Sequence, residues 1–160
     1  MIAWVCRAGK NAVHIDEFIE KEKIFFVWDG FSQNLNDYPT RDDLTLLVQK
    51  EMPLQEAGAI SRRVSQILTF RDSMQIGDIV ISPKSLGSSY CIGVIKSKYI
   101  FDRTAGNNFY HQRKVDWLIK DLAKERLSKY AQRSLGAVNT VYKFTYENEI
   151  LSILENIKNH

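Results

Sequence analysis

Short apolar segments, each closed by a turn or by charged residues, recur along this chain of 160 residues. Apolar runs bounded by turn-forming residues are typical of β-strands. The sequence therefore predicts strands over residues 2–6, 24–28, 79–82, 90–101, 111–118 and 140–144, the fourth of them bent at Gly93. Several short strands with a few helices between them favour an α+β domain built on a small, curved β-barrel or sheet with peripheral helices.

Helical patterns occupy the gaps between these strands. We predict helices over residues 16–21, 40–50, 56–71, 121–127 and 147–157. The Thr40 side chain can accept a hydrogen bond from the free amides at the start of its helix, and Asp43 gives the segment a resemblance to a capping box. A chain of this length can bury one core. We therefore expect a single domain over residues 1–145, followed over residues 146–160 by an amphipathic helix or a linker to a further domain.

Charge is distributed unevenly along the chain. Residues 1–60 carry 6 Lys and Arg against 10 Asp and Glu, whereas residues 61–143 carry 15 against 6. The basic stretch also contains aromatic residues in strand-like surroundings, namely Tyr90, Tyr99, Phe101, Tyr110 and Trp117. Cations neutralise phosphates, and aromatic rings stack on bases. The distribution therefore favours nucleic acid as the partner.

Residues that commonly carry catalysis are not spaced for it in this sequence. His14, His111 and His160 are too scattered to suggest a metal site. The sequence contains neither a Gly-x-Ser-x-Gly nucleophile elbow nor a glycine loop of the kind that binds phosphate. Asp116 lacks the downstream Glu-x-Lys partner that a nuclease would need. We therefore expect a module without enzyme activity, metal or cofactor.

The compartment follows from the cysteines and from overall hydrophobicity. Cys6 and Cys91 lie inside apolar segments, where a thiol usually acts as a small hydrophobe, so we expect both to be reduced. No stretch approaches the roughly 20 apolar residues of a membrane span. The first residues also lack a basic leader followed by an apolar run. The sequence thus predicts a cytoplasmic protein without membrane contact.

Aromatic and cationic residues are the best candidates for contacts with a nucleic acid. Trp28 ends a predicted strand, a rim position where an indole can contact a ligand or complete the core. Trp4 and Trp117 are base-contact candidates whose strand positions also suit the core, and Tyr110 is a candidate second ring beside Trp28. The candidate phosphate contacts are Arg7, Lys84, Arg113 and Lys114, each of which is individually more typical of a solvated surface.

Several segments, taken in order, resemble the amino-terminal module of Mrr-like restriction endonucleases. They are residues 4–9, residues 67–70 with Met74, residues 77–80, residues 92–95, Tyr99, residues 113–117, residues 134–136 and residues 140–141. That module is similar to the EVE and YTH domains of the PUA-like superfamily, and residues 28–30 resemble the edge of the EVE pocket. The resemblance implies a PUA-like barrel that holds a modified base in an aromatic pocket, and a nuclease domain or subunit as its partner. The pocket residues that define YTH domains have no one-to-one match here.

The residues and the resemblance together predict a non-catalytic DNA-binding module. We expect it to sense a modified base in duplex DNA by rotating that base out of the stack, and so to target a restriction or defence nuclease. Three alternatives stay open. The module can instead bind modified or structured RNA, recognise a small nucleotide signal, or dock a partner through its terminal helix at residues 150–157.

Overall fold

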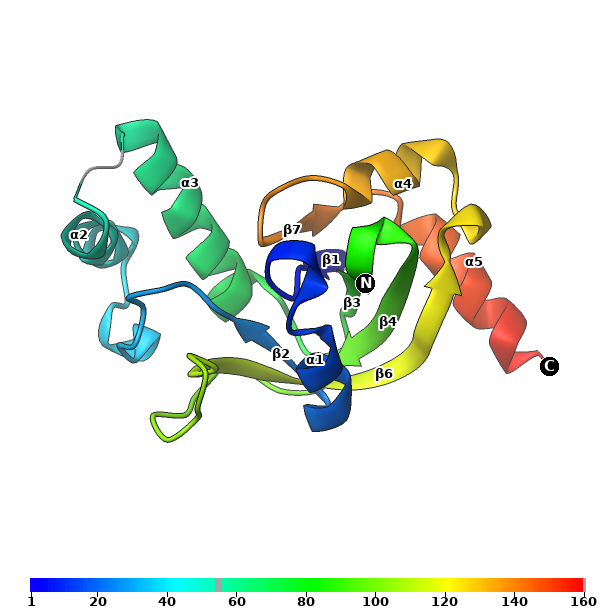
Figure 1. Cartoon of the computed structure of the whole chain (residues 1–160), viewed down its shortest axis with the longest axis horizontal. Helices are drawn as coiled ribbons and strands as arrows, with labels where there is room; N and C mark the ends of the chain where they lie inside the picture. The colour runs from blue at the N-terminus through cyan, green and yellow to red at the C-terminus, as the bar shows by residue number, and fades with distance from the viewer. Residues whose placement is uncertain (54–55, 160) are drawn as a thin grey trace.

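A curled, mixed β-sheet forms the centre of the domain in the computed structural model, which describes residues 1–53 and 56–159 (Figure 1). Within these residues its strands are β1 (Ala3–Cys6), β2 (Lys23–Phe26), β3 (Ile79–Pro83), β4 (Ser89–Ile95), β5 (Ile100–Phe101), β6 (His111–Ala123) and β7 (Val141–Phe144). The order is β2-β6-β4-β3-β1-β7, and β5 pairs with the start of β6. β1 and β3 are parallel, whereas the other pairs are antiparallel. The predicted α+β class with a small curved sheet is confirmed.

Helices cover both faces of this sheet. The α-helices are α1 (Ile15–Lys21), α2 (Arg41–Glu51), α3 (Ala57–Leu68), α4 (Lys129–Leu135) and α5 (Glu147–Lys158). A π-helical turn, η3 (Thr69–Ser73), extends α3, and short 3-10 turns form η1 (Lys10–Ala12), η2 (Leu35–Asp37), η4 (Ser85–Gly87) and η5 (Lys124–Arg126). The capping box predicted for α2 is present, because Thr40 Oγ1 accepts from the Asp43 amide and Asp43 Oδ2 accepts from the Thr40 amide.

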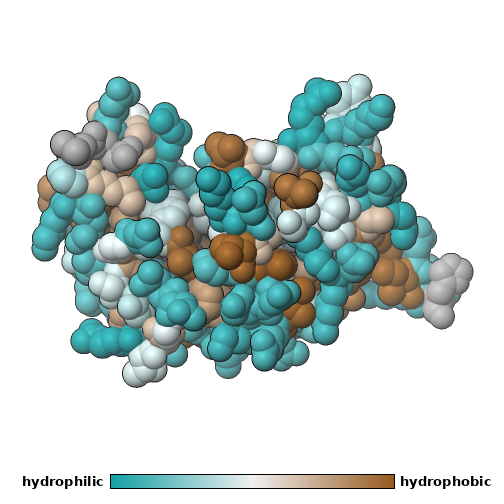
Figure 2. Space-filling view, in the orientation of Figure 1, coloured by the Kyte–Doolittle hydropathy of each residue, from teal (hydrophilic) through white to brown (hydrophobic). Residues whose placement is uncertain are grey.

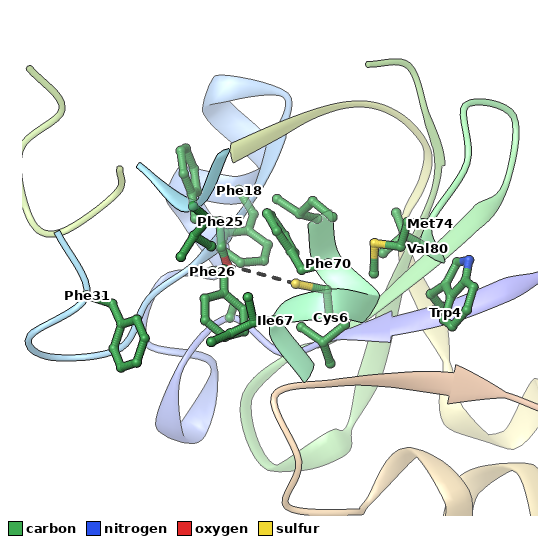
Figure 3. Close-up of a cluster of buried hydrophobic side chains, with 14 of the residues drawn as sticks. Trp4, Cys6, Phe18, Phe25, Phe26, Phe31, Ile67, Phe70, Met74 and Val80 are labelled. Carbon is green, nitrogen blue, oxygen red and sulfur yellow. Dashed lines mark hydrogen bonds between the residues drawn. The ribbon is translucent and has the colours of Figure 1, made fainter. Parts of the chain in front are cut away.

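Alternate residues of each central strand enter two separate cores. In β1, Trp4 and Cys6 join one cluster, whereas Ala3 and Val5 join the other. The first cluster lies between the sheet and α1 to α3, and Figure 3 shows its aromatic centre, where the Cys6 thiol lies 3.9 Å from the Phe25 carbonyl oxygen. Cys6 and Cys91 are both buried and unbridged, and burial raises the pKa of the Cys91 thiol to about 11. These thiols are therefore protonated and inert near neutral pH.

The second cluster lies on the opposite face of the sheet, beneath α4 and α5. Ile150 and Ile153 of α5 are buried against it, and Leu151 and Leu154 pack at its edge. Ile157, near the end of the helix, is exposed. The terminal helix thus buries its apolar face against the same sheet as the rest of the chain.

Two predicted segments differ from the structure, for reasons that lie outside their own sequence. β4 ends at Ile95, whereas one strand was expected to continue to residue 101. Just beyond β4, the Ser97 carbonyl accepts hydrogen bonds from the Arg113 side chain instead of from a neighbouring strand. β6 continues to Ala123, so residues 121–123 are strand and not the start of a helix. The helix α4, which begins at the Ser128 cap, was not predicted.

Candidate functional site

Among residues 1–53 and 56–159 the curled sheet does not close, and its edge strands β2 and β7 leave a gap that we call the seam. Trp28 follows β2, and its indole Nε1 donates a hydrogen bond of 3.1 Å to Oγ1 of Thr140, just before β7. Gln66 of α3 accepts hydrogen bonds from the amides of Thr140 and Val141 at 2.8 and 3.1 Å. Side chains therefore bridge the seam where a closed barrel would have backbone pairing.

A cavity of about 460 Å³, the seam cavity, opens beside this bridge. Its volume lies in the range of about 300–1,000 Å³ that is usual for small-ligand sites. The residues that line it are Arg7, Gly9, Lys10, Asn11, Val27, Trp28, Val138 and Thr140. Among the lining residues that the structure describes, two are cationic and none carries a carboxylate. The cavity therefore suits an anionic ligand that has an apolar or flat part.

A second, smaller cavity adjoins the first. It measures about 260 Å³ and shares Arg7, Gly9 and Asn11 with the seam cavity. Its other side includes Lys84 and Leu86. Figure 2 shows the face of the molecule that is viewed in Figure 1. On this face apolar side chains gather near the middle, between polar lobes formed by α2–α3 and by α4.

The Trp28 indole is held firmly at the rim of the seam cavity. Its ring contacts Phe26 at a centroid distance of 4.2 Å and Phe31 edge-on at 5.6 Å. The guanidinium of Arg63, from α3, lies 4.9 Å from the ring centroid, a cation–π contact. The indole is half-buried, so part of its ring remains accessible to a ligand beside these cations. The sequence predicts Trp28 as a rim residue, but no local pattern indicates that Arg63 lies on its ring.

Arg7 and Lys84, two of the predicted phosphate contacts, line these adjoining cavities. The Arg7 amide donates to the Thr140 carbonyl at 2.8 Å, and its Nη1 donates to the Ala137 carbonyl at 3.0 Å, which anchors the residue beside the seam. Its guanidinium has further donors that can contact a ligand. Lys84 Nζ lies 3.5 Å from Oδ1 of Asp121; the lysine is half-buried and the carboxylate exposed, so the pair has small energetic value. Both cations are therefore available to an incoming anion.

Trp4 and Trp117, predicted as base-contact candidates, are core residues instead. Their exposed fractions are 7% and 8%. Each indole N–H is satisfied inside the protein, that of Trp4 by Oδ2 of Asp78 at 2.9 Å and that of Trp117 by the Phe18 carbonyl at 2.8 Å. Neither residue lines the seam cavity.

Arg113, predicted as a phosphate contact, is buried and serves as an internal clamp. Its exposed fraction is 1%. The buried guanidinium is satisfied inside the protein, because Nε and Nη2 both donate to the Ser97 carbonyl and Nη1 donates to the Phe70 carbonyl. Burial lowers the pKa of this guanidinium, and the charges of Asp78 and Asp72 oppose that effect. Arg113 shares a face of β6 with Val115 and Trp117, and the fold buries that face. The basic side chain, taken alone, suggested the wrong role.

Tyr110 and Lys114 lie away from the seam cavity. Tyr110 lines a separate depression with Tyr38 and Arg103. Trp28 and Tyr110 therefore line different cavities, and the expectation that they flank one base is not met. Lys114 is exposed beside three further lysines, Lys21, Lys23 and Lys96. The cationic residues thus form more than one surface group.

The described histidines make contacts of a structural kind. His111 is buried, with its Nε2 2.7 Å from the Phe31 carbonyl and its Nδ1 2.7 Å from the Tyr99 hydroxyl. Burial lowers the His111 pKa. His14 meets the Phe109 ring edge-on, and His160 lies outside the described residues. Across residues 1–53 and 56–159, no group of three or more His, Cys, Asp or Glu side chains is arranged to hold a metal, and no helix has the length and hydrophobicity to cross a membrane.

The fold and the site define an α+β domain on a curled half-barrel, with a cationic cavity beside an indole at its open seam. The chain belongs to the family described as a domain of unknown function, DUF8426, whose model matches residues 4–145. The matched span contains every residue that lines the seam cavity. No curated protein matches the chain significantly.

Proposed function

We propose that this domain is a PUA-like nucleic-acid-binding module that takes one base of duplex DNA into the seam cavity and reads a modification on it. One observation carries the proposal. The half-buried Trp28 lines a cavity together with Arg7 and Lys10, and the described lining residues include no carboxylate. A ring beside uncompensated cations matches a nucleotide, which joins a flat base to an anionic phosphate.

In this proposal the indole provides the stacking surface and the nearby arginines stabilise the phosphates. Trp28 is fixed by its hydrogen bond to Thr140 and by Phe26, so stacking on it requires little ordering. A base that stacks on the face covered by Arg63 displaces the guanidinium, which then contacts phosphate. Stacking contributes about 1–3 kcal/mol per base and offsets part of the cost of removing that base from the duplex.

The test compares wild type with Trp28→Ala on duplexes that differ only in one modified base, by fluorescence anisotropy at several salt concentrations. Wild type should prefer the modified duplex. Trp28→Ala should lose this preference and retain weak, salt-sensitive binding, because phosphate contacts carry no base information. Tyr110→Ala is the matched control, since this half-buried ring lines another depression and should leave the preference unchanged.

Equal affinity of wild type for modified and unmodified duplexes, across the common base modifications, would refute modified-base recognition. Stronger competition by a matched RNA would favour the RNA alternative. Thermal stabilisation by a mononucleotide, without binding to long polyanions, would favour a nucleotide receptor. Binding to none of these would leave a protein-interaction module, in which a partner nuclease docks on the domain.

A further inference from the structure

Two large apolar side chains project into solvent at the edges of the paired cavities. Leu86, at the tip of the η4 turn, is 89% exposed and lines the smaller cavity. Val138, in the segment between α4 and β7, is 88% exposed and lines the seam cavity. Single exposed apolar residues are ordinary on protein surfaces. Leu86 and Val138, however, flank the same pair of cationic cavities, which indicates a surface that is covered when a ligand binds.

The backbone at Leu86 adds a second, independent observation. Leu86 has φ 59° and ψ 17°, the left-handed conformation, in which the Cβ of a non-glycine residue crowds the following carbonyl oxygen. The turn is closed by hydrogen bonds from the Gly87 amide to the Lys84 carbonyl and from the Lys84 amide to the Ser89 carbonyl. Asparagine or glycine adopts this conformation more easily than leucine does. Within the domain, leucine gains neither burial nor a relaxed backbone at this position.

We propose that Leu86 is an apolar wedge that enters the base stack of duplex DNA when a neighbouring base rotates into the seam cavity. The inference rests on the proposed function and adds the element that opens the duplex. Proteins that kink or unstack DNA commonly insert apolar side chains between base steps. Leu86 shares its cavity with Lys84 and Arg7, which can bind the phosphates that flank the opened step. Leucine also extends further from its backbone than Val138, which remains at the lip of the seam cavity.

Leu86→Asn tests the wedge without an expected loss of folding, because asparagine tolerates the left-handed conformation. The matched control is Leu46→Gln on α2, an exposed leucine outside both cavities. The probes are a paired DNA duplex with 2-aminopurine next to the target base, and the single strand of the same sequence. Leu86→Asn should bind the duplex about tenfold more weakly and the single strand within about twofold of wild type, because only the duplex has a stack to open. The rise in 2-aminopurine fluorescence on duplex binding should fall in the same variant.

The outcomes separate this inference from the function on which it rests. If wild type binds the duplex in a Trp28-dependent way and Leu86→Asn matches it on both probes, the wedge is overturned and the proposed function stands. Equal weakening on duplex and single strand also overturns the wedge, since Leu86 is then a simple contact. If wild type produces no fluorescence rise and Trp28→Ala changes nothing, both proposals fail.

Discussion

Replacing Arg113 by methionine should destabilise the fold and leave the seam cavity unaltered. The Arg113 side chain on β6 is 1% exposed, and its guanidinium donates hydrogen bonds to two carbonyl groups from different segments. Nη1 reaches the Phe70 carbonyl at 2.9 Å, and Nη2 and Nε reach the Ser97 carbonyl at 2.9 and 3.1 Å. Methionine keeps an aliphatic stem but is shorter and has no donor, so the buried Phe70 carbonyl and the partly buried Ser97 carbonyl lose these partners.

The expected magnitude follows from those two carbonyl groups. A buried group that loses its hydrogen-bond partner costs about 1–3 kcal/mol, so two such groups give about 2–6 kcal/mol. Removing a buried charge returns part of this, and we expect a net loss of about 3 kcal/mol. With a urea dependence of about 1–3 kcal/mol per M for a domain of this size, the unfolding midpoint should fall by about 1–3 M.

The assay is urea unfolding followed by tryptophan fluorescence and circular dichroism. Lys114→Met is the control, because Lys114 is the exposed neighbour on the same strand and surface changes usually stay within about 0.5 kcal/mol. Arg113→Lys should fall between the two, since one ammonium keeps the charge but not the bidentate geometry. The reasoning is refuted if Arg113→Met unfolds at the same urea concentration as Lys114→Met but binds DNA more weakly. Arg113 would then be the phosphate contact that its sequence type suggests.

Two further predictions concern β4 and the buried histidine. Gly93→Ala should lower the free energy of unfolding, measured in urea, by about 1–3 kcal/mol, because a Cβ there would lie 2.4 Å from Cγ1 of Val115 and 3.0 Å from the Asp116 backbone oxygen. Gly106→Ala has open space around the added Cβ and should be nearly neutral in the same assay, so similar losses for both variants would contradict the packing argument. Because burial lowers the His111 pKa in the folded state, the unfolded state binds more protons, so the free energy of unfolding should fall as the pH drops below about 6.5. Urea unfolding at several pH values should show a smaller decline in His111→Gln, and an identical decline in both proteins would count against this assignment.

Local patterns predicted the parts of the fold that depend on neighbouring residues. The capping box of Thr40 and Asp43 is formed by residues three apart, so the sequence alone indicates it. The alternation in β6 likewise indicates that Arg113 and Trp117 share one face of the strand and Lys114 lies on the other, but the fold decides that the first face is the buried one. The break after β4 could not be predicted in this way, because it depends on Arg113, 16 residues from Ser97.

In the candidate site, too, local features could be predicted from the sequence and contacts between distant residues could not. Trp28 was predictable as a rim residue because it ends an apolar segment, just before Asp29 and Gly30. Its partners were not, since Thr140 lies 112 residues away and Arg63 approaches from a helix whose sequence indicates only which face is apolar. The basic character of residues 61–143 pointed to a polyanion, but the fold places Lys84 at the smaller cavity, Arg113 in the core, and Lys96 and Lys114 in a separate lysine group. The cations that line the seam cavity, Arg7 and Lys10, come instead from the acidic residues 1–60.

The three indole N–H groups offer the most direct test of the central claim, that a base enters the seam cavity beside Trp28. Each has a different acceptor, Asp78 for Trp4, Thr140 for Trp28 and the Phe18 carbonyl for Trp117, so a proton–nitrogen correlation spectrum should show three separate signals. Their assignment follows from Trp28→Phe, which removes one of them. Titration with a modified duplex should shift the Trp28 signal strongly and leave the two core signals in place. Saturable binding with an unmoved Trp28 signal would contradict the claim.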